Sequence, residues 1–333
     1  MIDKNRVESA MIDELPEIGI VNFPGAQLAA VLGMADLLSA ADELARRASE
    51  QLDRPRLRVS QWEWPNNADA PVRVFDTCPD HSGSPAVLVL PPGLGEPLSS
   101  DKAAPFARWL REQHEAGAAL GSICKGAFLL AETGLFAGRT VTTHWTYEAE
   151  FQERFPMAHV DTDRLLIDDG DLLTAGGVMA WTDLTLRLVE RFLGVSVMLD
   201  TAQVFLIDPP GREQSYYSSF VPKLNHGDAA IRAIQHWLHE TAGKDFALPA
   251  LVERSGLEKR TFLRRFQNAT GLTTTEYGQR LRVNRARELL QAGHLTGDQV
   301  AWEVGYGDPG AFRKMFIRIV GLSPAEYRRR FRG

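Results

Sequence analysis

A stretch of sixteen residues near the C-terminal end of the chain occurs twice, at a constant offset of fifty residues. Residues 262–277 and 312–327 share Phe at their first and fifth positions, Gly-Leu at the tenth and eleventh, and Glu-Tyr at the end. Self-similarity at a fixed period indicates one supersecondary unit used twice. Because basic residues lie between the two shared Phe residues in both copies, we expect two helical units, each with an apolar inner face and a basic outer face.

Length and composition predict an ordinary globular protein. The chain has 333 residues, which predicts about two domains, and 44% of them are hydrophobic and 24% charged. No apolar run approaches the roughly 20 residues that a membrane helix needs, and the mixed charge at the start of the chain predicts no secretory signal. The two cysteines, Cys78 and Cys124, are too few for a disulfide framework or a cysteine-rich metal site. We therefore expect a cytoplasmic protein without a metal ion or other cofactor.

Charge is distributed unevenly along the chain. The formal net charge is −6, but residues 226–333 hold 18 Lys and Arg against 11 Asp and Glu, a net charge of +7. The remaining residues hold 19 basic and 32 acidic side chains, a net charge of −13. A basic segment on an acidic body indicates one domain that binds a polyanion and one that does not, unless the basic helices are merely solvated.

The first copy of the repeat belongs to a pattern of helix, glycine turn and helix. Residues 248–255 predict a short helix, Gly256 a tight turn, and residues 259–268 a second helix. Phe262 and Phe266 are four residues apart and face the core. The opposite face of this helix carries Arg260, Thr261, Arg264 and Arg265. The pattern is that of a helix-turn-helix unit, whose second helix enters a groove of DNA.

The second copy repeats this arrangement. Residues 296–304 predict a helix, Gly305 predicts a turn, and another helix begins at Pro309. With its two Phe side chains buried, this last helix exposes Arg313, Lys314 and Arg318. Between the copies, residues 275–291 predict a helix about 24 Å long. Such a helix can hold two reading helices about one turn of DNA apart, which is roughly 34 Å.

Residues 231–331 resemble the AraC/XylS family of bacterial transcription regulators, notably in Ala301-Trp-Glu-Val-Gly-Tyr306 and in the closing stretch 321–329. The resemblance implies an all-α domain whose two helix-turn-helix units read DNA sequence. The positions for which it implies base contacts are Arg260, Leu263 and Arg264 in the first unit and Gly310, Arg313 and Lys314 in the second. The alternative for each side chain is a phosphate contact, which positions the protein without specifying a sequence.

Two residues depart from the pattern of this family. Glu258 stands where relatives usually have Ser at the start of the first reading helix, so we expect it to cap that helix poorly. Gly310 has no side chain with which to read a base. We therefore expect the first unit to carry most of the base reading and the second to depend more on phosphate contacts.

The first 200 residues alternate apolar runs with helical stretches. The runs that predict strands are residues 18–23, 86–90, 118–124 and 172–177. The helical stretches are residues 26–48, 125–131 and 178–193. Repeated strand, glycine turn and helix indicate an α/β domain with a flavodoxin-like parallel sheet covered on both faces. Ligands of such sheets bind at the carboxyl ends of the strands.

Cys124 lies at a predicted strand-to-helix turn, where the helix dipole can lower the pKa of a thiol. With His144 twenty residues later and the glycine turns at residues 91–93 and 174–177, this segment resembles the PfpI-like branch of the class I glutamine amidotransferase superfamily. The resemblance implies a catalytic Cys, a His and an acid after the first strand. That acid maps near Ala30, where there is none, and Asp36 follows more than a helical turn later. We therefore expect no enzyme, with Cys124 and His144 as vestigial catalytic residues.

Taken together, the two halves resemble the GlxA-like subfamily of transcription regulators. The expected organisation is a disordered tail at 1–15, a PfpI-like sensor at 16–200, a linker at 201–225 and an AraC-type DNA-binding domain at 226–333. The expected partners are double-stranded operator DNA, a small-molecule effector, a second copy of the chain and, if the protein activates, RNA polymerase. The residues expected to bind the effector are Pro92, Gly93, Cys124, Lys125, His144, Trp145 and Gly176.

Two other functions remain open at this point. One is a cysteine-dependent hydrolase or hydratase that carries a DNA anchor, although the missing acid argues against it. The other is a redox sensor in which Lys125 stabilises a Cys124 thiolate that is then oxidised.

Overall fold

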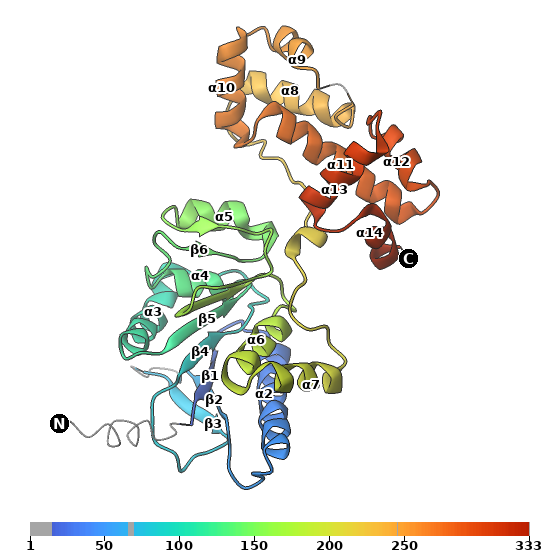
Figure 1. Cartoon of the computed structure of the whole chain (residues 1–333). Helices are drawn as coiled ribbons and strands as arrows, with labels where there is room; N and C mark the ends of the chain where they lie inside the picture. The colour runs from blue at the N-terminus through green and yellow to red at the C-terminus, as the bar shows by residue number, and fades with distance from the viewer. Residues whose placement is uncertain (1–14, 66–69, 245, 333) are drawn as a thin grey trace, which may run out of the picture. The chain divides into compact units, whose positions relative to one another are not determined.

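The computed structural model of the chain describes residues 15–65, 70–244 and 246–332 (Figure 1). These residues form two compact units, one ending at Gln214 and one beginning at Ser215. The expected linker, residues 201–225, is therefore divided between the units, and the expected sensor limit at residue 200 lies inside a helix of the first unit. The tail expected at residues 1–15 lies, apart from Leu15, outside the described residues.

A seven-stranded sheet in the order β3-β2-β1-β4-β5-β9-β8 forms the centre of the first unit. Its strands are β1 (Glu17–Asn22), β2 (Arg58–Glu63), β3 (Val72–Asp76), β4 (Val87–Leu90), β5 (Ala119–Ile123), β8 (Leu166–Asp168) and β9 (Leu172–Ala175). The five central strands run parallel, as predicted, whereas the edge strands β3 and β8 are antiparallel to their neighbours, so the sheet is mixed. A separate parallel pair consists of β6 (Thr140–Val141) and β7 (His159–Val160).

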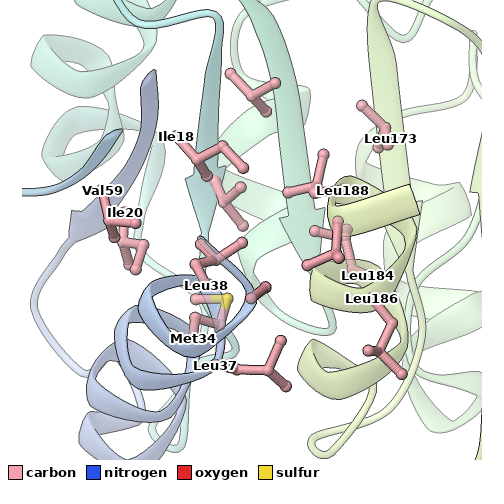
Figure 2. Close-up of a cluster of buried hydrophobic side chains, with 14 of the residues drawn as sticks. Ile18, Ile20, Met34, Leu37, Leu38, Val59, Leu173, Leu184, Leu186 and Leu188 are labelled. Carbon is pink, nitrogen blue, oxygen red and sulfur yellow. The ribbon is translucent and has the colours of Figure 1, made fainter. Parts of the chain in front are cut away.

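Helices cover both faces of the large sheet (Figure 1). On one face are α2 (Leu28–Ala48), α6 (Trp181–Leu193) and α7 (Val195–Phe205), and on the other are α3 (Ser100–Glu115) and α4 (Gly126–Ala131) with the short α5 (Glu148–Arg154). Successive strand residues point to opposite faces, so Ile18 and Ile20 of β1 pack with the first group of helices and Val21 packs with the second. Figure 2 shows the first of these cores, to which Met34 of α2 and Leu184 of α6 contribute.

The regular structure described for the second unit is all helical, and a turn of 3-10 helix (Gln214–Tyr216) spans the boundary between the two units. Its α-helices are α8 (Ala229–Glu240), α9 (Leu248–Ser255), α10 (Lys259–Thr270), α11 (Thr274–Ala292), α12 (Gly297–Glu303), α13 (Pro309–Val320) and α14 (Pro324–Phe331). One hydrophobic cluster joins α8, α9 and α10 to the first half of α11, and another joins the second half of α11 to α12, α13 and α14. With 19 residues, α11 is about 28 Å long and belongs to both clusters.

Within the described ranges, no helix is both long and apolar enough to cross a lipid bilayer.

Candidate nucleic-acid interface and effector site

The two copies of the repeat fold into nearly the same local structure. The matched ring pairs have centroid separations of 5.7 Å in Phe262–Phe266 and 5.6 Å in Phe312–Phe316, both at an interplanar angle of 55°. The next matched pairs are 5.4 Å apart in Phe266–Tyr277 and 5.6 Å apart in Phe316–Tyr327. All six rings are buried. The repeated residues therefore build one scaffold twice, as the sequence predicts.

Turns and caps determine where the reading helices α10 and α13 begin. Gly256 ends α9 with φ of +65°, a left-handed conformation that favours glycine. The Glu258 carboxylate accepts hydrogen bonds from the backbone N–H groups of Arg260 and Thr261. Asp308 caps α13 in the same way. The expectation that Glu258 caps poorly is wrong, because its longer side chain reaches the first free N–H groups of α10 and its charge favours a helix N-terminus.

The basic face of α10 is only partly available to a partner. Arg260 and Arg264 are exposed, whereas Thr261 and Leu263 are half-buried, and Leu263 packs against the core of its unit. Arg265 is half-buried and donates two hydrogen bonds, of 2.8 and 2.7 Å, to the carboxylate of Asp228, the N-cap residue of α8. Of these predicted contacts, Arg260 and Arg264 are therefore the ones whose charges face solvent.

The corresponding face of α13 carries more exposed residues. Gly310, Arg313, Lys314 and Arg318 are all exposed. Arg318 donates to Oε1 of Gln279 on α11 at 2.9 Å, so its guanidinium points toward α11. Arg313 and Lys314 thus occupy on α13 the positions that Leu263 and Arg264 occupy on α10, and only one of these two matched pairs carries a positive charge in both units.

The predicted effector residues come from the ends of neighbouring strands. Gly93, after β4, lies beside Lys125, because an added Cβ would be 3.5 Å from Lys125 Cβ. The Cys124 N–H donates to Ala175 O at 2.7 Å, and the Thr143 hydroxyl donates to Cys124 O at 2.8 Å. Lys125 is near enough to His144 for its charge to lower the pKa of the imidazole. Trp145 and Gly176 both lie beside Gln214, since the Trp145 N–H donates to Gln214 Oε1 at 3.2 Å and an added Cβ on Gly176 would be 2.0 Å from Gln214 Nε2. The carbonyl of Pro92 accepts from the Gln27 N–H at 2.7 Å.

Cys124 has the backbone of a nucleophile elbow but not its acidity. Its φ of +54° is left-handed, which is unusual for a residue with a side chain, and the side chain is 1% exposed. Burial raises the pKa of the thiol to about 11, against the weaker opposing effects of the backbone amides of Lys125 and Gly177 and of the Lys125 ammonium. The expectation that the helix dipole lowers this pKa is therefore wrong. The helix α4 has six residues, and desolvation has the larger effect.

Lys125 and His144, the predicted neighbours of the thiol, both interact with other residues. Lys125 Nζ donates to Gly95 O at 2.5 Å and lies 4.8 Å from the centroid of the Tyr147 ring. His144 Nδ1 is 2.7 Å from Thr146 Oγ1, and the imidazole stacks on Trp145 with 5.7 Å between centroids. Burial, aided by the Lys125 charge, lowers the pKa of His144, so its ring is neutral at pH 7.

Ala30, near which the resemblance places an acid, lies in the hydrophobic core. Ala30 is fully buried in α2, and Asp36 is exposed farther along that helix. Within the described part of the chain, no group of three or more His, Cys, Asp or Glu side chains is placed to hold a metal ion.

Gln214 is a residue of this site that the sequence did not indicate. It is 2% exposed, and its amide Nε2 donates to Thr142 Oγ1 at 3.0 Å, Thr143 O at 2.8 Å and Arg164 O at 3.0 Å. Its Oε1 accepts from the Trp145 N–H at 3.2 Å. Gln214 therefore holds the segment that carries His144 and Trp145, although it lies in the stretch expected to be a linker.

The next residue, Ser215, is held just as firmly within the second unit. Its hydroxyl donates to Val320 O at the end of α13, at 3.1 Å, and its carbonyl accepts from Arg287 Nη2 at 2.7 Å. Arg287 lies on α11 and is 7% exposed. Because these partners are 72 and 105 residues away in sequence, no local pattern signals the contacts.

Comparison with known proteins matches each half of the chain separately. Residues 251–330 match the helix-turn-helix domain family, and residues 70–191 match the DJ-1/PfpI family. The HTH-type transcriptional regulator GlxA of Rhizobium meliloti (strain 1021) is 26% identical over 239 residues, which are 71% of this chain and 73% of that protein. Two regulators of Pseudomonas aeruginosa, CdhR and ArgR, are each 28% identical over 235 and 233 residues, which are 70% and 67% of this chain and 69% and 68% of those proteins.

Proposed function

Because the chain is an AraC-family helix-turn-helix regulator with an N-terminal DJ-1/PfpI domain, we propose that it reads a specific operator with both helix-turn-helix units. A small molecule bound in the N-terminal domain controls this binding. The observation that carries the DNA part is the repeated scaffold with unlike outer faces. The buried ring pairs have nearly the same geometry in both helix-turn-helix units, while the exposed side chains differ between them. Two scaffolds of the same geometry with different exposed side chains can each read a different short base sequence in the major groove.

Arg260 and Arg264 are the side chains through which α10 reads bases in this proposal. Both are exposed, and an Arg fork can donate two hydrogen bonds to N7 and O6 of guanine. Thr261, Leu263 and Arg265 then support the helix, since Arg265 is paired with Asp228. In α13, Arg313 and Lys314 contact DNA and Arg318 binds a backbone phosphate. Gly310, which has no side chain, lets the backbone of α13 approach the DNA closely.

The experiment that tests sequence reading is selection of bound duplexes from a random library, followed by affinity measurements at physiological salt. We expect the protein to enrich one sequence and to bind it more tightly than random duplex. Arg264→Ala should weaken binding to the selected sequence by about 1–3 kcal/mol and binding to random DNA much less. Arg108→Ala, which removes an exposed charge of the first unit, is the matched control. Equal affinity for selected and random DNA would refute sequence reading.

The effector site in this proposal is the cluster around Cys124, Lys125, His144 and Trp145. A neutral stacked imidazole, an indole and one ammonium group offer an aromatic wall and a single positive charge. A ligand there changes DNA binding only if it binds the two states of the protein unequally. A thermal-shift screen of metabolites tests this, because a bound ligand raises the unfolding temperature by mass action. A ligand whose shift persists in Trp145→Ala would bind elsewhere.

We propose no enzymatic activity for the first unit. Its thiol has a raised pKa, its His144 is hydrogen-bonded to Thr146, and Ala30 occupies the position of the acid. A hydrolase would show turnover of a small amide that Cys124→Ser abolishes.

We also propose that the protein acts in the cytoplasm as a homodimer and contacts RNA polymerase if it activates. Exposed apolar side chains on α2 and α7, including Leu32 and Leu199, support self-association. Sedimentation velocity at micromolar concentration tests it, and a monomer at that concentration would contradict it.

A further inference from the structure

The middle of α11 carries an arginine, Arg282, that contacts residues packed on both hydrophobic clusters of the helical domain. Arg282 Nε donates to Gly243 O at 2.8 Å, and Nη2 donates to Lys244 O at 2.8 Å. Nη1 donates to Gly305 O at 2.9 Å. Gly243 and Lys244 follow α8, whose core also holds α10, whereas Gly305 forms the turn between α12 and α13. One guanidinium therefore joins the end of the first cluster to the turn that starts the second reading helix.

Aromatic rings enclose the same guanidinium. Its carbon lies 4.4 Å from the centroid of Phe246 and 5.3 Å from that of Tyr306, within the range of cation–π attraction. Phe246 belongs to the first cluster and Tyr306 to the second. The ring contacts of Arg282 therefore connect the same two parts of the helical domain as its hydrogen bonds do.

Glycines allow the close approach on which these contacts depend. A Cβ on Gly278 would lie 2.7 Å from the Phe246 ring, and a Cβ on Gly305 would lie 3.0 Å from Arg282 Nη2. Gly305 also has φ of +83°, which disfavours a side chain there. The ion pair between Lys244 and Glu303, at 3.3 Å, spans the same junction.

We propose that Arg282 is a positioning residue for DNA binding, which holds the reading helices α10 and α13 in the arrangement that lets both bind one duplex at once. Two linked binding modules gain affinity over either alone when their connection matches the spacing of the sites, and lose that gain when it does not. The planar guanidinium has five donors in fixed directions, so it can satisfy three carbonyls together, whereas an ammonium group is a compact point charge. The proposal rests on the proposed function only in that both helix-turn-helix units bind DNA.

The test compares whole and half operators in the full-length protein. An operator is first selected with the wild-type chain, and two half operators are made by scrambling the bases protected by one unit or the other. Arg282→Lys keeps the charge and removes the fork. We expect it to weaken binding to the whole operator about tenfold or more and binding to either half operator less than about twofold. Arg285→Lys, an exposed residue of α11 paired with Glu288, is the control and should change neither.

A second selection adds a readout that a loss of stability would not produce. Wild-type protein should enrich half sites at one spacing, and Arg282→Lys should enrich several spacings. If Arg282→Lys does not fold, Phe246→Leu removes one stacked ring and keeps the three hydrogen bonds, and should weaken whole-operator binding about threefold with half-operator binding unchanged.

Four outcomes would overturn the proposal. Equal losses on whole and half operators would make Arg282 a DNA contact or a general stabiliser of the fold. Unchanged affinity for the whole operator, or one spacing selected by both proteins, would show that the arrangement does not depend on it. A wild-type protein that enriches no sequence would instead refute the proposed function, and this proposal with it.

Discussion

The acidity of the Cys124 thiol distinguishes a ligand-binding unit from an enzyme or a redox sensor. Burial raises the thiol pKa from 9.0 to about 11. At pH 7 the reactive thiolate is then about one part in ten thousand, against about one in a hundred for a thiol with the unshifted value, because each pKa unit is a factor of ten. The titration to be measured is that of this one thiol in the folded protein.

The assay is the thiolate absorbance near 240 nm of the wild-type protein minus that of Cys124→Ser, followed from pH 6 to pH 10. We expect no step in this difference below about pH 9.5, since the midpoint lies near 11. Mass spectrometry after brief alkylation gives the second measurement, and the modification of Cys124 should increase about tenfold per pH unit. A midpoint below pH 8 would refute the reasoning and restore the enzyme and redox hypotheses.

The same shift affects stability, with a definite sign. The native state holds the thiol proton more tightly than the unfolded chain, so this contribution is fully present below pH 9.0. It is lost between 9.0 and about 11, as the unfolded thiol ionises first. Two pKa units correspond to about 2.7 kcal/mol. The unfolding free energy of Cys124→Ser should therefore depend less steeply on pH in that range than that of the wild-type protein.

Three further predictions concern the packing around the two sites. Gln214→Glu presents a buried carboxylate to three oxygen atoms and should destabilise the first unit by about 3 kcal/mol or more in calorimetry, whereas the exposed Gln203→Glu should change little; similar losses in both would mean that the three hydrogen bonds contribute nothing. Phe316→Ala should cost about 3–5 kcal/mol of unfolding free energy, measured by urea denaturation, because it empties a fully buried position, and a cost under 1 kcal/mol would show that the core refills. Ser323→Ala removes half of the capping box of α14 and should cost about 1 kcal/mol in the same assay. An unchanged unfolding midpoint would contradict this prediction.

Local patterns accounted for the parts of the fold that depend on local geometry. The helix-turn-helix units were predictable because Phe262 and Phe266 share a helix face and Gly256 requires a left-handed turn, both of which are visible within a few residues. The central parallel strands were predictable because they are buried on both faces and therefore continuously apolar. The elbow at Cys124 was predictable because an apolar strand is followed directly by a helical stretch at that residue.

Other features depend on residues that are distant in sequence. The edge strand β3 has exposed Val72 and Val74, so its side chains do not show the apolar run of a buried strand. The raised thiol pKa depends on how completely the neighbouring strands exclude water, which spacing does not reveal. Gln214 and Arg282 find their partners as far as 72 and 39 residues away, and polar residues of this kind are common at surfaces. The cap by Glu258 was missed because Glu is an uncommon residue at that position.

The division of the chain between Gln214 and Ser215 bears on how such regulators could acquire new sensors. Each side chain at this bond is held within its own unit, Gln214 by Thr143 and Ser215 by Val320. A recombination that joins a foreign sensor at this bond would leave both sets of contacts complete. A junction near residue 226 would instead replace Ser215 and remove the hydrogen bond from its hydroxyl to Val320 O. Exchange of whole sensors between relatives should therefore be tolerated at this one peptide bond and penalised a few residues to either side of it.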